Sequence, residues 1–112
     1  MTNTLSTHVL DTMHGRPASG LRLVLSGPDG EIARGITNSD GRCPDLTQGA
    51  IGAGRYTLRF AVAEYFRALG VELPDPPFLD EVNVDFGIAE DGGHYHVPLL
   101  VSPYGYSTYR GS

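Results

Sequence analysis

Short runs in which apolar and polar residues alternate constrain the fold of this chain more than any other feature. In residues 21–27, LRLVLSG, the side chains of Leu21, Leu23 and Leu25 share one face of an extended strand, because successive side chains on a strand point to opposite sides. Fifteen glycines and eight prolines punctuate the chain, a density that favours many short strands over a few long helices. Five further runs are predicted to be strands: residues 5–11, 31–38, 55–62, 81–88 and 94–102. Strands at this spacing indicate a β-sandwich.

One segment, AEYFRALGV, departs from the two-residue rhythm. Its apolar residues Tyr65, Phe66 and Leu69 lie at i, i+1 and i+4, which places them on one face of a helix. Gly70 follows directly, and glycine commonly ends a helix. The sequence therefore predicts one short helix at about 63–69.

The remaining punctuation predicts loops and turns. Proline lacks a backbone donor, so the segment LPDPPF after the helix is expected to be a loop. The segment EDGG, residues 90–93, is expected to form a hairpin-type turn between two strands. No internal repeat or low-complexity segment is present, and residues 1–112 are expected to form a single domain.

Charge and cysteine content exclude several classes of protein. The net charge of −5, without a run of Lys or Arg, argues against nucleic-acid binding. No apolar stretch approaches the roughly 20 residues of a membrane span, and the first residues do not read as a secretory signal. Cys43 is the only cysteine, so no intrachain disulfide can form. These features predict a cytoplasmic protein, and Cys43, which precedes Pro44 and has no obvious base partner, is disfavoured as a nucleophile.

Histidines break the apolar pattern on the outer faces of two predicted strands. His94 and His96 alternate with core-facing residues in HYHVPLLVS, and His8 faces outward in LSTHVLD. The simplest interpretation of each one alone is a solvated surface histidine. Two histidines at i, i+2 can also chelate zinc, although no third ligand of suitable spacing follows. Pro98 and Leu100 share the outer face with His94 and His96, which points to a protein–protein contact.

Two further features stand out near turns and at the end of the chain. Arg42 follows the turn NSDG, where the commoner situation is a solvated arginine or one paired with Asp40. The closing stretch YSTYRGS contains two tyrosines, and Tyr104 lies just before it, whereas disordered tails are poor in aromatic residues. The end of the chain is therefore expected to belong to a working surface.

Four blocks resemble the transthyretin-like 5-hydroxyisourate hydrolases of purine (urate) breakdown: LSTHVLDTMHGRPASG, TNSDGRC, the YF of the helix, and HYHVPLLVSPYGYSTYRGS. The resemblance covers essentially the whole chain and is looser in the middle. It implies an all-β, transthyretin-like two-sheet β-sandwich of about eight strands in Greek-key order. It also implies a homotetramer, a dimer of dimers, with active sites at the interface between dimers and open to a central channel.

The resemblance also implies which residues act. These are His8, Arg42 and His96 as the catalytic set and Tyr109, Arg110, Gly111 and Ser112 as substrate-binding residues. The implied reaction hydrolyses 5-hydroxyisourate, a planar purine-derived small molecule, to 2-oxo-4-hydroxy-4-carboxy-5-ureidoimidazoline, without a metal or organic cofactor. One histidine takes a proton from water and the other orients water or substrate, with His96 favoured as the base.

The chemistry of the other groups in this set suggests supporting roles. Arg42 holds the substrate and stabilises the negative charge that develops, because a guanidinium offers planar donors and a permanent charge. Tyr109 packs against or hydrogen-bonds the substrate ring, and the Ser112 carboxylate orients one imidazole.

Two other classes of protein are compatible with the same fold. Transthyretin itself carries small hydrophobic ligands in its channel, and a third class would be a structural β-sandwich used for assembly. The two histidines, the arginine and the YRGS ending occur together here, and a carrier has no need of that polar set. The hydrolase is therefore the favoured function.

Overall fold

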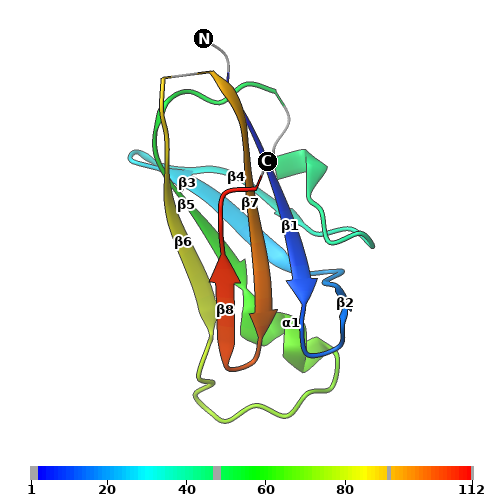
Figure 1. The fold of residues 1–112 in the computed structure, drawn as a ribbon. Helices are drawn as coiled ribbons and strands as arrows, with labels where there is room; N and C mark the ends of the chain where they lie inside the picture. The colour runs from blue at the N-terminus through cyan, green and yellow to red at the C-terminus, as the bar shows by residue number, and fades with distance from the viewer. Residues whose placement is uncertain (1–2, 47–48, 91, 112) are drawn as a thin grey trace.

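The computed structural model describes residues 3–46, 49–90 and 92–111, which form two four-stranded sheets packed face to face (Figure 1). One sheet has the order β2-β1-β7-β8 and the other β4-β3-β5-β6, which confirms the predicted two-sheet sandwich of eight strands within the described residues. The strands are β1 (Asn3–Asp11), β2 (Arg16–Pro17), β3 (Arg22–Gly27), β4 (Gly30–Ile36), β5 (Gly54–Ala61), β6 (Glu81–Ile88), β7 (Gly93–Ser102) and β8 (Gly105–Thr108). The helices are a 3₁₀ turn η1 (Pro44–Leu46) and α1 (Val62–Ala68).

The core lies between the two sheets and follows the alternation in the sequence. Every odd-numbered residue of β1 is buried and every even-numbered one is half-buried. Buried leucines of β3 meet buried aromatic and aliphatic side chains of β5, β6 and β7, with Phe60 and Phe66 fully enclosed. Burying a side chain of this size contributes about 1.5–3 kcal/mol, so the core dominates the stability of the sandwich.

Strands β1 and β7, from opposite ends of the chain, pair in parallel at the centre of their sheet. Figure 1 shows them side by side, with β2 and β8 on the outer edges. The register pairs Ser6 with His96 and His8 with Pro98. Pairing of this kind cannot be read from local periodicity, and it determines which outer-face side chains are neighbours.

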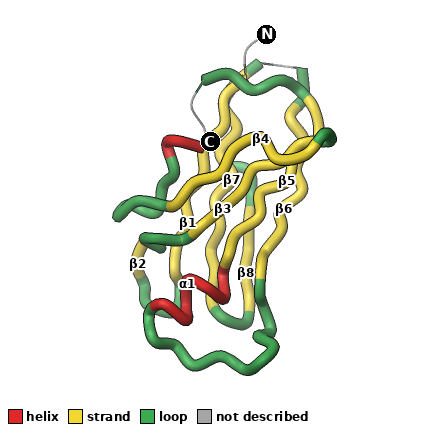
Figure 2. Tube along the Cα trace, turned by 180° about the vertical axis from the view of Figure 1, so that it is seen from behind, coloured by secondary structure: helices red, strands yellow, loops and turns green. Residues whose placement is uncertain are grey.

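Helix α1 begins directly after β5 and lies at one end of the sandwich (Figure 2). It begins and ends one residue earlier than predicted, and Gly70 follows it with φ of +83°, a conformation that favours glycine. Tyr65 and Phe66 are buried with their rings 5.0 Å apart in an edge-to-face arrangement. Leu69, expected on the same buried face, is 42% exposed because the helix has already ended.

One turn and two short strands differ from expectation. The expected hairpin turn at 90–93 is wrong, because β6 and β7 belong to different sheets and cannot be hairpin partners; Asp91 lies outside the described residues. The two-residue strand β2 was not predicted. Strand β8 was not predicted either, and it pairs antiparallel with the end of β7, so YSTYRGS starts as a sheet edge rather than a tail.

A buried carboxylate joins β1 to α1. Asp11 accepts hydrogen bonds from the Tyr65 hydroxyl at 2.7 Å and from the His14 backbone N at 2.9 Å, and it contacts His14 Nδ1 at 2.6 Å. Burial raises the pKa of Asp11, but the hydrogen bonds from Tyr65 and His14 outweigh it, so the pKa lies below its ordinary value. Burial and the bond to Asp11 raise the pKa of Tyr65 to about 12.

Among the described residues no helix is long and apolar enough to cross a membrane.

Tyr65→Phe is expected to lower the free energy of unfolding by about 1–3 kcal/mol, because it removes a donor from a buried carboxylate. Urea denaturation followed by circular dichroism measures the change. Tyr104→Phe, at an exposed tyrosine, serves as the matched control and should leave the unfolding midpoint unchanged. Equal midpoints for Tyr65→Phe and the wild type would contradict a stabilising role for this bond.

Candidate active site

The parallel register of β1 and β7 arranges two rows of polar side chains on the outer face of their sheet. Thr4 lies beside His94, Ser6 beside His96, and His8 beside Pro98. His8 and His96 are therefore diagonal neighbours on adjacent strands, and both are half-buried. The predicted outward direction of the histidines is confirmed.

The apolar residues of the same face are less exposed than expected. Pro98 is buried and Leu100 is half-buried within the single chain. Along the outer face of β7, the polar residues His94 and His96 are therefore followed by the apolar residues Pro98 and Leu100.

Arg42 is held by a tight turn after β4. The side-chain oxygen of Asn38 accepts hydrogen bonds from the backbone N of Asp40 and of Arg42, both at 3.0 Å. The backbone N of Asn38 also donates to the carbonyl of Arg42 at 2.8 Å, which closes the turn. Among the ion pairs between described residues none joins Arg42 to Asp40, and the side chain of Arg42 is exposed. The turn thus presents the guanidinium rather than neutralising it.

The same turn docks on β1 beside His8. The backbones of His8 and Arg42 form an isolated antiparallel bridge, and Val9 N donates to the Gly41 carbonyl at 2.8 Å. Gly41 has φ of +75°, and a Cβ there would collide with the Val9 carbonyl oxygen and lie 3.3 Å from His8 Cδ2. Only glycine allows this approach, which explains why Gly41 precedes Arg42 in the sequence NSDGR.

The C-terminal segment docks on β7 beside His96. Gly111 N donates to the His96 carbonyl at 2.7 Å, and the two residues form an isolated bridge. A Cβ on Gly111 would lie 2.5 Å from His96 Cδ2, so the backbone of the segment lies directly against the imidazole edge. Ser112 lies outside the described residues.

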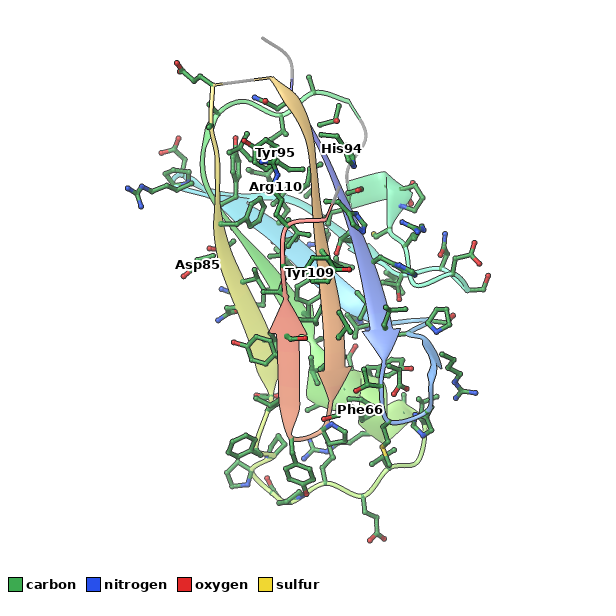
Figure 3. The ribbon with its side chains drawn as sticks, viewed as in Figure 1. Phe66, Asp85, His94, Tyr95, Tyr109 and Arg110 are labelled. Atoms are coloured by element: carbon green, nitrogen blue, oxygen red, sulfur yellow. The ribbon has the colours of Figure 1, made fainter. Side chains whose placement is uncertain are left out.

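The other two residues of the predicted terminal set, Tyr109 and Arg110, border a different part of the chain. The Arg110 guanidinium carbon lies 3.9 Å from the centre of the Tyr95 ring, a cation–π arrangement. Tyr95 faces the core and the His94 side chain faces outward, so the guanidinium and the His94 ring lie on opposite faces of β7. Figure 3 labels the three residues. Arg110 borders a cavity of about 230 Å³ between the two sheets, and Tyr109 is 59% exposed. The structure therefore brings Gly111, but not the Arg110 side chain, to His96.

The surroundings of His96 favour its neutral form. Burial lowers the pKa of His96, and the positive charge of Arg42 and of protonated His8 and His94 lowers it further. A neutral imidazole has one nitrogen free to accept a proton. Ser6 Oγ lies 2.7 Å from His96 Nδ1, so Nδ1 is already engaged within the chain.

The sequence analysis does not predict the hydroxyl groups that surround the histidines. Ser6 Oγ also lies 2.6 Å from His94 Nε2, and Thr4 Oγ1 lies 2.7 Å from His94 Nδ1. The rings of His94 and His96 are nearly parallel, with centroids 6.5 Å apart. The available signal was the alternation of Thr4, Ser6 and His8, which puts three polar side chains on one strand face.

Cys43 and a metal centre were the other candidates for chemistry. Cys43 is buried, burial raises the pKa of its thiol, and its Sγ lies so close to Gly35 that a Cβ there would be 2.5 Å away. This thiol packs in the core, away from the outer face. Within residues 3–46, 49–90 and 92–111, no three His, Cys, Asp or Glu side chains are grouped as a metal ion requires.

Known proteins are similar to this chain in sequence and in fold. The model of the HIUase/Transthyretin family matches residues 5–111. A protein named 5-hydroxyisourate hydrolase from Ralstonia nicotianae is 54% identical, over 96% of this chain and 97% of that protein. The structure of Klebsiella pneumoniae 5-hydroxyisourate hydrolase superposes with a TM-score of 0.85 at 37% identity, covering 98% of this chain and 94% of that one.

Transthyretin also has this fold. Sea bream transthyretin in complex with thyroxine superposes with a TM-score of 0.80 at 30% identity, covering 96% of this chain and 93% of that one. Sequence and structure agree over nearly the whole length in each comparison. The chain therefore belongs to the HIUase/Transthyretin family.

Proposed function

We infer that this chain hydrolyses 5-hydroxyisourate to 2-oxo-4-hydroxy-4-carboxy-5-ureidoimidazoline, a step of purine (urate) catabolism. Its relative named for that activity is 54% identical over nearly the full length of both chains. The observation that carries the inference is a pair of backbone bridges, His8 with Arg42 and His96 with Gly111, which bring four segments of the chain together around the β1–β7 pair. Two imidazoles and a guanidinium so placed suit hydrolysis of a polarised carbonyl.

The reaction divides between His96 and Arg42. Neutral His96 accepts a proton at Nε2 as the oxygen of water bonds to the ring carbonyl carbon. The negative charge that develops on the carbonyl oxygen is stabilised by the Arg42 guanidinium. The carbon–nitrogen bond of the ring then breaks, and the leaving nitrogen takes the proton back from the imidazolium. His8 orients the water or the substrate.

The C-terminal segment completes the substrate site in this proposal. Exposed Tyr109 is free to pack on the planar substrate ring, and Gly111 closes one side of His96. Arg110, which contacts Tyr95 in the single chain, contributes its positive charge at the border of the site. Ser112, outside the described residues, is proposed to orient an imidazole.

The proposed assembly is a homotetramer, a dimer of dimers, with the outer face of the β2-β1-β7-β8 sheet turned toward a second copy. Within one chain this face leaves Arg42 exposed and both catalytic imidazoles half-buried, so a small planar substrate has a wall on one side only. Tyr106 and Tyr109 are exposed at and beyond the edge strand β8. A second copy supplies the missing wall. A cytoplasmic location stays a prediction.

A non-catalytic carrier of small ligands is the second candidate, favoured by the structural similarity to transthyretin in complex with thyroxine. The two functions differ in one observable. A hydrolase accelerates the decay of 5-hydroxyisourate in the ultraviolet, above the spontaneous rate, whereas a carrier leaves that rate unchanged.

His8→Ala and His96→Ala are each expected to lower kcat/KM at least about 100-fold, because each removes a group that handles the proton or positions water. Arg42→Ala is expected to have an effect of the same order. Decay of 5-hydroxyisourate generated in place by urate oxidase is the assay, with an enzyme-free sample for the spontaneous rate. Arg59→Ala, an exposed arginine of the other sheet, is the matched control. Near wild-type rates for both histidine variants would show the assignment to be wrong.

The pH profile is expected to report the lowered pKa of His96. The base works only when neutral, so kcat/KM should fall as pH drops through this pKa, with the acid limb below the ordinary histidine value of about 6.5. Arg42→Gln removes a positive charge that lowers this pKa, so the limb should move to higher pH although the rate falls overall. A limb that stays in place in Arg42→Gln would contradict electrostatic tuning by Arg42.

Gly111→Ala is expected to lower kcat/KM about 10-fold or more, because the new Cβ would lie 2.5 Å from His96 Cδ2 and must displace the ring or the segment. The unfolding midpoint should stay within error of the wild type, since the segment lies outside the core. Gly52→Ala, whose Cβ meets no atom closer than 3.9 Å, is the control.

Deleting residues 109–112 should abolish turnover and leave the sandwich folded. Full activity in the truncated chain would make the segment a dispensable tail.

A further inference from the structure

Ser6 lies between the two imidazoles of β7. Its Oγ is 2.7 Å from His96 Nδ1 and 2.6 Å from His94 Nε2, and Thr4 Oγ1 is 2.7 Å from His94 Nδ1. The parallel register of β1 and β7 produces this arrangement, because it sets Thr4 beside His94 and Ser6 beside His96. The four side chains form one unbroken series of hydrogen bonds along the sheet face.

We propose that Ser6, oriented by His94 and Thr4, is a positioning residue that determines which nitrogen of His96 accepts the proton from water. The proposal rests on the proposed function, in which His96 is the general base. His94, Ser6 and Thr4 then act through His96 and have no need to touch the substrate.

The single proton of the Ser6 hydroxyl limits how it can bond the two imidazoles. Ser6 can donate to only one of the two imidazoles and must accept from the other. If Ser6 accepts from His96 Nδ1–H, then Nε2 of His96 carries the free lone pair, Ser6 donates to His94 Nε2, and His94 Nδ1–H donates to Thr4. In the reverse arrangement Ser6 donates to His96 Nδ1, which leaves the proton of His96 on Nε2 and makes Nε2 useless as a base.

Only one of the two arrangements is compatible with protonation of His96 during the reaction. The imidazolium carries a proton on both nitrogens, so its Nδ1–H must donate to Ser6. Only the first arrangement already has that direction, and it needs no rotation of the Ser6 hydroxyl when the charge appears. An environment that is ordered before the charge develops costs no reorganisation at the moment of reaction.

The ring of His96 is also held from two sides. Ser6 engages Nδ1, while the backbone of Gly111 lies against Cδ2. These atoms are on opposite edges of the imidazole, and Nε2 remains as the nitrogen without an assigned partner in this scheme. The charged and titratable groups facing the ring are Arg42 from the turn after β4, His8 from β1 and His94 from β7 itself.

The test compares Ser6→Ala, Ser6→Thr and His94→Asn with a control, Thr57→Ala. Thr57 is a strand residue of the other sheet whose hydroxyl bonds Asp85 at 2.6 Å, so the control loses a comparable hydrogen bond away from the site. Each variant is measured for kcat and KM across pH with 5-hydroxyisourate. The protonated nitrogen of neutral His96 is identified from the ¹⁵N chemical shifts of its ring.

In Ser6→Ala we expect kcat to fall about 10- to 100-fold, with KM changed by less than about threefold, because the base is misoriented rather than the substrate lost. The tautomer of neutral His96 should shift toward Nε2–H. Ser6→Thr, which keeps a hydroxyl, should restore the Nδ1–H tautomer and most of kcat. His94→Asn should show a smaller loss of kcat in the same direction, and Thr57→Ala none.

A wild-type kcat in Ser6→Ala, or an unchanged His96 tautomer in that variant, would overturn the proposal. Ser6→Thr as slow as Ser6→Ala would attribute the loss to packing and overturn it as well. The proposed function fails separately, because it requires His96→Ala to lose at least about 100-fold in kcat/KM whatever Ser6→Ala does. The tautomer measurement needs no turnover, so it tests the role of Ser6 even if the substrate is a different one.

Discussion

The parallel pairing of β1 with β7 is the interaction on which the rest of the structure depends. It joins the two ends of the chain at the centre of one sheet and is reinforced by a buried hydrogen bond from the Thr7 hydroxyl to the Val97 carbonyl at 2.7 Å. A change of one residue in this register would bring core side chains of one strand beside outer-face side chains of the other. The requirement to fill the core therefore also sets the spacing of the histidines outside it.

Two glycines carry this order from the sheet to the loops. Gly41 lets the turn that bears Arg42 approach β1, and Gly111 lets the C-terminal segment approach the ring of His96. In both places a side chain on the approaching residue would meet the neighbouring strand. The chemistry of the site thus depends on backbone contacts at positions that have no functional group of their own.

The opposite end of β1 has a different task. There the buried Asp11 carboxylate links the strand to His14 and to Tyr65 of α1, and its polar contacts are satisfied within the chain. Around His96, by contrast, the polar groups are partly open, with Arg42 exposed. A strand whose inner face and far end are firmly held is a suitable rigid base for side chains that must keep their geometry during a reaction.

The sequence by itself determined the long strands, the helix to within one residue, and the faces of β1 and β7, because side-chain alternation is a property of the local backbone. It also determined the chemical types of the site residues and their resemblance to a family. It missed the short strands β2 and β8 and placed a hairpin at 90–93, since pairing between strands is not local. Only the tertiary structure decided that Ser6 lies between two imidazoles, that Arg110 rests on Tyr95, and that burial lowers the pKa of His96, because register and desolvation arise from segments that meet only in the folded chain.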